Sequence, residues 1–534
     1  MPTPAKRTNS FVRQAAILAA ASLFVRFIGF LYRIPFTRLI GDAGMADYTT
    51  AYQVFTFFIA LTSGALPVAI SRLVSERIAR EQYLNAHKIF KTSLIFATAA
   101  GGIAGLIMLF GAEIITYFMG APGATLAIRS FAPTVVIVGI LAVFRGYFQG
   151  MKTAIPTATS QVVEQIFKVV MTLWLAHLFF NAANLSPAVA AGTIGTGIAA
   201  AAGLAVVMVL YAIVAKDLHR RVNRDKNYAA DENRRTQIAA IVKTAAPMLL
   251  AMTILSASGL LDLQMASGRM LASLAFSDEA VRIAIGQFQN IFILLITLPV
   301  ALSVALSAAV VPDITSSSVQ MNHEAVKHKT NMALRLSMIL SIPSAIGLSV
   351  LADPIVTLLF GRYQEGGWLL RYGAASIIFI ALYHVLTGAL QGLGYIKLPV
   401  IAVFIGVLIK IPINYVLIAL PSINILGTVI STIACYIVAA GINMYFLYKH
   451  TGILPDLSAA FIKPLVASVG MGMICYVTYH LINIFAPSPV ATIGALCAGA
   501  ASYVLFMCVI KGFRESDLQA MPLPQKVKSL LLKL

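Results

Sequence analysis

The chain has 534 residues, of which 59% are hydrophobic and only 11% are charged, and its mean hydropathy is +0.87. Soluble proteins carry about 25% charged residues, so this composition excludes a soluble globular protein and indicates a polytopic membrane protein. The net charge of +19 does not indicate nucleic-acid binding, because the Lys and Arg residues fall where membrane topology places them.

Apolar segments of about 20 residues recur along the whole chain, which predicts membrane-spanning helices. They lack the alternation of a membrane β-barrel, so the fold is predicted to be all-α. We predict about fourteen transmembrane helices. They are expected near 14–36, 46–70, 88–110, 127–149, 156–180, 187–215, 243–267, 283–310, 329–352, 368–391, 398–420, 424–448, 459–485 and 488–511.

The distribution of basic residues predicts the orientation of these helices. The segment from Lys216 to Lys243 alone contains eight Lys and Arg residues, whereas the predicted outer loops together contain four. The positive-inside rule therefore places both termini in the cytoplasm. We expect the basic N-terminal segment to enter the first span rather than to be a cleaved signal peptide, because Arg26 and Arg33 do not suit the apolar core of one.

The sequence contains a long internal repeat in one orientation. The motif Arg-Gly-Tyr-Phe-Gln-Gly at 145–150 recurs as Thr-Gly-Ala-Leu-Gln-Gly at 387–392. Three pairs are each 242 residues apart: Gln149 and Gln391, Lys168 and Lys410, and Arg129 and Arg371. The repeat-motif candidates are Arg145, Gln149, Gly150, Gln391 and Gly392. Duplicated units of about six helices build several transporter folds, with a central site between two lobes.

The repeat divides the chain into four parts. Residues 1–215 are predicted to form an N-terminal lobe of six helices, and 243–449 a C-terminal lobe of six. Residues 216–242 form a basic linker between them. Residues 450–534 add two helices and a tail that have no counterpart in the repeat.

Charged residues deep in predicted spans are the main site candidates, because each costs about 2.5–3.5 kcal/mol at the centre of a membrane helix. Six lie there: Arg26, Arg33, Glu164, Lys168, Asp262 and Lys410. Four are cations and two are acids, which predicts a cationic cavity that selects an anion. The planar guanidinium group of arginine suits a phosphate or pyrophosphate.

Structural interpretations of these charges remain open. Glu164 and Lys168 are four residues apart, so they are able to pair on one helix face. Pairing of an arginine with Asp262 would only fix the helix register. Lys168 and Lys410 occupy equivalent positions in the two lobes, so we expect them to face each other across the central cavity.

The sequence contains no pattern that indicates catalysis or metal binding. It has no phosphate-binding loop and no His-Glu-x-x-His motif, and its four cysteines all fall in predicted spans, where they are expected to pack as small residues. We therefore predict a protein that is not an enzyme and that binds no cofactor or metal.

Three segments resemble the polysaccharide-flippase branch of the multidrug/oligosaccharidyl-lipid/polysaccharide (MOP) exporter superfamily. They are the run from Arg145 to Gln165, the run from Arg26 to Pro35, and Leu-Pro-Val-Ala-Ile-Ser at 66–71. Within that branch the chain is similar to the MurJ/SpoVB type, which comprises lipid II flippases and sporulation relatives, over essentially its whole length.

This resemblance implies a V-shaped, MATE-like transporter that works by alternating access in the bacterial cytoplasmic membrane. Its expected substrate is an undecaprenyl-pyrophosphate-linked glycan, lipid II, and its other partners are membrane lipids. Arg26 and Arg33 match the positions that bind pyrophosphate in the family, and Lys168, Lys410, Glu164 and Asp262 would add cavity charge. The two additional C-terminal helices would form a groove for the lipid tail, and a monomer is expected.

Alternatives to this interpretation remain open. The same fold could export another undecaprenyl-linked oligosaccharide, such as a capsule, teichoic-type or spore-cortex precursor. A drug/cation antiporter of the superfamily would need an acidic cavity, and a membrane glycosyltransferase would need a catalytic acid in a sizeable outer loop. Sodium, protons or the membrane potential could drive transport, and Lys410 in the span where relatives place a sodium-binding carboxylate disfavours sodium.

Overall fold

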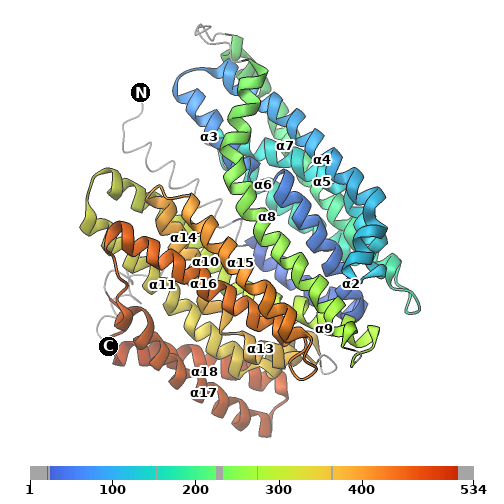
Figure 1. Cartoon of the computed structure of the whole chain (residues 1–534), viewed down its shortest axis with the longest axis vertical. Coiled ribbons are helices and arrows are strands. Elements are labelled where there is room, and N and C mark those ends of the chain that lie inside the picture. Colours follow the sequence, from blue (N-terminus) through green and yellow to red (C-terminus); the bar gives the residue numbers. More distant parts are fainter. Residues whose placement is uncertain are drawn as a thin grey trace. The chain divides into compact units, whose positions relative to one another are not determined.

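The structure is a computed structural model that describes residues 21, 24–151, 153–223, 233–273, 275–361 and 365–514, with the side chains of 216–223, 308–310, 312, 313 and 319 excepted. The start of the first predicted span and parts of the predicted linker and tail lie outside these residues. Within them the chain folds into helices without strands, as predicted (Figure 1).

The helices form two compact units. The first comprises Met1–Gly268 and Asp278–Gly286, and the second Arg269–Ser277 and Gln287–Leu534. The helices of the first unit are α2 (Arg33–Thr62), α3 (Leu66–Ala79), α4 (Tyr83–Met119), η1 (Pro122–Ala124), α5 (Thr125–Gly150), α6 (Ile155–Leu178), α7 (Ser186–Asn223), most of α8 (Arg234–Ala272) and all but the last residue of α9 (Asp278–Gln287).

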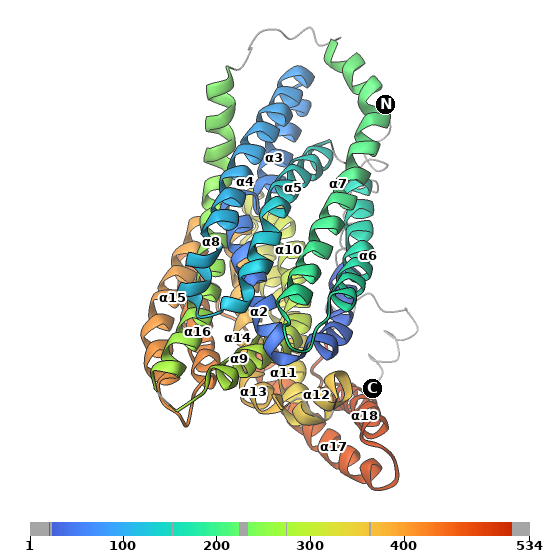
Figure 2. The ribbon, with the colours of Figure 1, turned by 90° about the vertical axis from the view of Figure 1, so that its right-hand side faces the viewer.

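The helices of the second unit are the π-helix η3 (Phe288–Ile293), α10 (Leu294–Val319), α11 (His323–Val350), α12 (Ala352–Phe360), α13 (Gly367–Gly373), α14 (Ser376–Gly392), α15 (Lys397–Ile418), α16 (Leu426–Thr451), η4 (Ser458–Ile462), α17 (Lys463–Phe485) and α18 (Ser488–Val509). The last two lie side by side in both views of the ribbon (Figures 1 and 2). They are the pair that the repeat does not contain.

Eleven helices among the described residues are long and apolar enough to cross a membrane, or twelve if the bent pair α13 and α14 is one span. The prediction of fourteen differs from this number for two reasons. The first predicted span is only partly described. The fifth coincides with α6, which is 24 residues long but is not among the eleven. Polar residues, Glu164 and Lys168 among them, lower its hydropathy.

A sharp turn inside α2 separates the first two predicted spans. Gly41 has a φ of +68°, in the left-handed region that favours glycine, and the helical backbone resumes directly after it. A side chain at Gly41 would meet no atom within 4 Å, so only the backbone conformation requires glycine here.

Close helix packing explains the glycines of the repeated motif. A Cβ atom added to Gly146 of α5 would lie 2.8 Å from the carbonyl oxygen of Pro67 in α3. A Cβ atom added to Gly388 of α14 would lie 2.9 Å from that of Ser307 in α10. The two units therefore use equivalent glycines to bring equivalent helices together, as small-residue motifs do in membranes.

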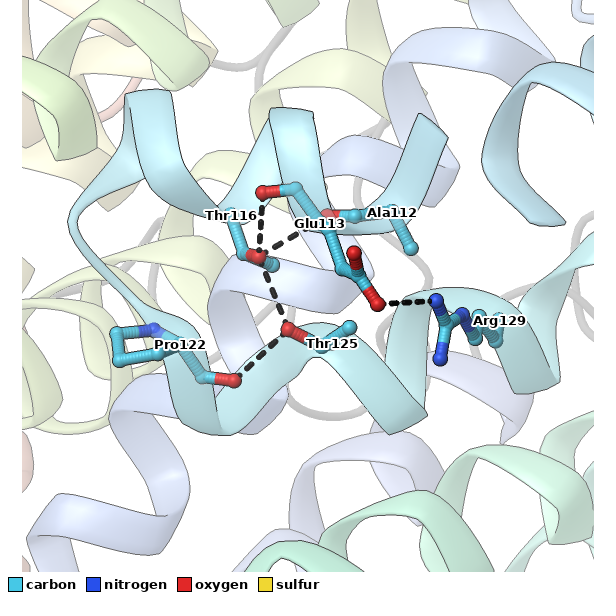
Figure 3. Close-up of polar contacts among 6 residues, drawn as sticks. All are labelled: Ala112, Glu113, Thr116, Pro122, Thr125 and Arg129. Carbon is cyan, nitrogen blue, oxygen red and sulfur yellow. Dashed lines mark hydrogen bonds and ion pairs between the residues drawn. The ribbon is translucent and has the colours of Figure 1, made fainter. Parts of the chain in front are cut away.

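An ion pair is also repeated. Arg129 of α5 donates to Glu113 of α4 at 2.7 Å (Figure 3). At the equivalent place in the second unit, Arg371 of α13 pairs with Asp353 of α12. Each of the two arginines, which are 242 residues apart in the repeat, thus pairs with a carboxylate in its own unit.

The division into compact units differs from the division into repeats. Helix α8, the first helix of the second repeat, lies mostly in the first unit. Two polar contacts attach it there: Gln53 donates from Nε2 to the carbonyl oxygen of Ser256 at 3.3 Å, and the hydroxyl of Thr92 donates to Gln237 at 2.6 Å. The repeat marks duplicated sequence, whereas the compact unit reflects packing.

The connection before α17 is fixed by Asp456. Its Oδ1 accepts a hydrogen bond from the backbone N–H of Ala459 at 3.1 Å, and its other oxygen pairs with Arg514. The hydrogen bond from Ala459 and the charge of Arg514 hold the pKa of the Asp456 carboxyl below its usual value, against a weaker opposing effect of burial.

Candidate functional site

The first unit contains a cluster of cations and tyrosines, formed by Arg33, Lys168, Tyr32, Tyr48 and Tyr52. Tyr32 immediately precedes α2, and its backbone is hydrogen bonded to Ile28 and Phe36 like that of a continuing helix. Tyr48 and Tyr52 lie one helical turn apart in the part of α2 that follows Gly41. Lys168 comes from α6, so three helical segments meet at this cluster.

Two aromatic rings hold the ammonium group of Lys168. Its Nζ lies 4.9 Å from the centre of the Tyr52 ring and 5.6 Å from that of Tyr32. The guanidinium carbon of Arg33 lies 5.9 Å from the Tyr52 ring centre. All three distances are within the range in which a cation is attracted to an aromatic face.

Neither cation of this cluster has a carboxylate partner in the part of the chain that the structure describes. Among the described residues, the ion pairs involve neither Arg33 nor Lys168. Both side chains are half-buried. Two neighbouring cations without a carboxylate partner among the described residues form a site suited to an anion, because ammonium and guanidinium groups each donate several hydrogen bonds.

Glu164 pairs with a neighbouring helix and not with Lys168. Its Oε2 accepts a hydrogen bond from Nη2 of Arg145 at 2.7 Å, and Nε of Arg145 donates to the hydroxyl of Ser160 at 2.9 Å. The interpretation of Glu164 and Lys168 as an i,i+4 pair is therefore wrong. Glu164 points toward α5, whereas Lys168 extends to the tyrosine rings.

The remaining candidates come from other segments of the chain: Arg26 precedes α2, Asp262 lies on α8 and Lys410 on α15. Arg26 is exposed and, within the described part of the chain, takes part in no ion pair. Asp262 of α8 is buried in the first unit, and Lys410 of α15 is buried in the second. One turn after Lys410, Asn414 accepts a hydrogen bond from Ser431 of α16 at 3.1 Å.

The repeat-motif residues serve packing and pairing at the ends of α5 and α14. Gly150 and Gly392 are buried, and an added Cβ would lie 2.7 Å from Val74 and 3.0 Å from Ile314, respectively. Gln149 is half-buried and Gln391 exposed. Arg145 is the motif residue with a charged partner, Glu164.

Sequence reasoning missed the three tyrosines. Tyrosine in an apolar span is commonly a packing residue, so it attracted no functional interpretation. The available signal was Tyr48 and Tyr52 at i,i+4 spacing, one turn apart on a single face, in the same predicted lobe as three of the four deep cations.

The described residues contain no group of three or more His, Cys, Asp or Glu side chains that could hold a metal ion. Cys435, Cys475 and Cys508 are buried and Cys497 is exposed. The arrangement of the site thus offers cations and aromatic faces for binding.

Comparison with known proteins identifies the family. The sequence model of the family described as "MurJ: Lipid II flippase MurJ" matches residues 36–494. The chain belongs to the MurJ family. This match begins after Arg26 and Arg33, so the assignment of the family does not depend on the candidate arginines.

Two relatives from Bacillus subtilis (strain 168) have the same identity to the chain. Lipid II flippase MurJ is 26% identical over 463 residues, which cover 83% of this chain and 84% of that protein. Stage V sporulation protein B is 26% identical over 529 residues, covering 96% and 98%. The chain is thus similar to both relatives over most of their lengths.

Solved structures share the fold. "Lipid II flippase MurJ, inward closed conformation" superimposes with a TM-score of 0.69 at 17% identity, over 93% of this chain and 98% of that one. An inward-facing multidrug resistance MATE transporter of the MOP superfamily has a TM-score of 0.67 at 16% identity, over 82% and 98%. The MurJ-family chain is therefore a multi-pass membrane protein with the helical fold of these transporters.

Proposed function

We propose that this protein translocates lipid II, the lipid-linked peptidoglycan precursor, from the inner to the outer leaflet by alternating access. The observation that supports this best is the pair Arg33 and Lys168, two adjacent cations without a carboxylate partner among the described residues. Membership of the MurJ family supplies the class of activity.

The chemistry of the substrate matches this pair. A lipid-linked glycan of this class has a pyrophosphate between the lipid and the sugar, and its oxygens accept hydrogen bonds from ammonium and guanidinium groups. Such charge-assisted hydrogen bonds contribute about 1.5–3 kcal/mol each. Lys168 and Arg33 would bind the pyrophosphate, and the exposed Arg26, two turns before Arg33, would meet it on entry.

The second candidate function is transport of another undecaprenyl-linked glycan. The specific observation in its favour is that the sporulation relative matches more of this chain than the MurJ relative, at equal identity. Both substrates share the pyrophosphate, so the cation cluster serves either. A drug/cation antiporter is disfavoured because two cations without a carboxylate would repel a cationic drug.

The energy source and the topology are part of the proposal. Lys410 and the adjacent Asn414 occupy the α15 position at which a sodium site would need carboxylates, so we favour the membrane potential or a proton gradient. The excess of Lys and Arg in the linker supports cytoplasmic termini. We propose that the protein acts as a monomer in the cytoplasmic membrane.

Complementation tests this function. A bacterial host depleted of its essential lipid II flippase would express the wild-type chain or Lys168→Met, Arg33→Ala or Arg26→Ala, and lipid II in the outer leaflet would be measured directly. Lys397→Met, which alters an exposed lysine, is the matched control. Rescue by wild type and control, with at least a tenfold loss in Lys168→Met, supports the proposal. Absence of rescue by well-expressed wild type would favour the second candidate.

A further inference from the structure

The tyrosines beneath the cations are themselves held rigidly. The hydroxyl groups of Tyr32 and Tyr48 are hydrogen bonded at 3.3 Å, and both side chains are buried, with exposures of 3% and 0%. The Tyr48 ring meets Phe36 edge-on at 4.9 Å between centres. Tyr32 is therefore fixed through its hydroxyl, and Tyr48 through its hydroxyl and its ring.

Tyr52 is fixed by neighbouring rings. It stacks on Tyr48 at 6.0 Å between centres and meets Phe131 of α5 edge-on at 6.0 Å. Phe131 in turn stacks on Phe55 at 4.3 Å. The ring that lies nearest to Lys168 thus has neighbours from two helices that fix its plane.

An aromatic face compensates a cation differently from a carboxylate. A carboxylate accepts hydrogen bonds and so occupies the N–H groups of its partner, whereas a ring attracts the charge without occupying them. Both Lys168 and Arg33 share the Tyr52 face. The face of Tyr52 thus lowers the cost of two neighbouring cations in a membrane protein without accepting hydrogen bonds from them.

We propose that Tyr32, Tyr48 and Tyr52 are positioning residues that hold Lys168 and Arg33 ready for the phosphate oxygens of the transported lipid. This inference rests on the proposed function and assigns the tyrosines a role within it. Tyr52 acts on both cations through its face, and Tyr48 acts indirectly by fixing Tyr32. The class of ligand that the arrangement accepts is a lipid-linked phosphate or pyrophosphate.

Substitutions at position 52 test the role of the ring face. The full-length protein would be reconstituted in phosphatidylethanolamine–phosphatidylglycerol vesicles containing increasing amounts of lipid II, and the initial flipping rate measured. Replacing Tyr52 by phenylalanine keeps the face, and we expect the apparent KM to stay within about twofold. Replacing it by leucine removes the face, and we expect the apparent KM to rise about fivefold, since an exposed cation–π interaction contributes about 0.5–1 kcal/mol.

A fluorinated series keeps the test informative even if the leucine variant fails to fold. Phenylalanine with one, two and three ring fluorines at position 52 retains the ring shape while progressively weakening the negative face. We expect the apparent KM to rise stepwise to about fivefold, with unchanged thermal stability. A flat series would overturn the inference, because a residue that only fills space does not respond to fluorination.

A double substitution separates this inference from the proposed function. In a Lys168→Met background, Tyr52→Leu should raise the apparent KM further by less than about twofold, because one of its two cations is gone. If Lys168→Met and Arg33→Ala both leave flipping unchanged, the proposed site is wrong. If these two variants impair flipping, the site stands. The positioning role is then refuted if Tyr52→Leu has the wild-type apparent KM, or if it raises the apparent KM about fivefold in the Lys168→Met background as well.

Discussion

Replacing Glu164 with glutamine should destabilise the first unit measurably, because it breaks a half-buried ion pair. The Arg145–Glu164 pair is 2.7 Å long, and its side chains are only 16% and 28% exposed. A hydrogen bond to a charged group contributes about 1.5–3 kcal/mol. Partial exposure and the retained bond from Arg145 to Ser160 favour the lower end, so we predict a loss of about 1.5 kcal/mol in the free energy of unfolding.

The matched control is an exposed pair of nearly equal length. Arg80 and Glu76 are 2.8 Å apart, with side chains 65% and 48% exposed. Such i,i+4 pairs contribute about 0.3–0.5 kcal/mol. A double-mutant cycle would compare Glu164→Gln, Arg145→Gln and the double variant with the same three variants of the control pair.

The assay is reversible unfolding in mixed detergent–SDS micelles, followed by tryptophan fluorescence. We predict a coupling energy of about 1.5 kcal/mol for the half-buried pair and under about 0.5 kcal/mol for the control. Equal coupling energies in the two cycles would refute the reasoning that partial burial makes the Arg145–Glu164 pair structural.

Other substitutions test the packing and pairing of the fold. Arg282→Ala should lower the free energy of unfolding by about 3 kcal/mol, because it leaves the buried carboxylate of Asp47 without its ion-pair partner. A second change, Asp47→Asn, should restore part of this loss in the same unfolding assay. Gly146→Ala should destabilise the folded protein by about 1–3 kcal/mol, because its added methyl group would clash with α3. Gly102→Ala is the control, because its added methyl group would meet no atom within 4 Å and should leave the stability unchanged. A loss of stability in Gly102→Ala would contradict this explanation. Asp456, whose pKa is lowered in the folded protein, should stabilise the connection before α17 at any pH above the ordinary aspartate pKa of about 3.9, and this contribution should vanish as the pH falls through the lowered value. Asp456→Asn should remove that acid-dependent part of the stability, measured as the melting temperature between pH 6 and 3, and an unchanged pH profile would count against it.

The internal repeat predicted the most about the fold. It identified the glycines that allow close packing of α5 on α3 and α14 on α10, and it placed Arg129 and Arg371 at equivalent positions, where each has a carboxylate partner. These features could be predicted from the sequence because each depends on a short segment that recurs in both repeats.

Features that depend on packing between distant segments could not be predicted from the sequence. The i,i+4 spacing of Glu164 and Lys168 suggested a pair, but the Arg145 side chain from a neighbouring helix takes the carboxylate. Likewise, the repeat places α8 with the second lobe, whereas its contacts with α2 and α4 place most of it in the first compact unit. Sequence spacing shows which residues share one face of a helix, but it does not show which side chains of a neighbouring helix contact that face.

The tyrosine cluster was missed for a related reason. A tyrosine in an apolar span looks the same in sequence whether it fills space or supports a cation. Only the placement of Lys168 over the rings of Tyr32 and Tyr52 distinguishes the two. The charges of the site were therefore predictable, and the means by which they are held was not.

The most direct test of the central claim is the amount of lipid II in the outer leaflet of flippase-depleted cells that express Lys168→Met at wild-type levels. We predict that the wild-type chain and Lys397→Met restore outer-leaflet lipid II and that Lys168→Met restores less than about one tenth of it, since loss of one charge-assisted hydrogen bond is worth a factor of ten or more. Full restoration by Lys168→Met would contradict the account, because the cation cluster would then not bind the substrate.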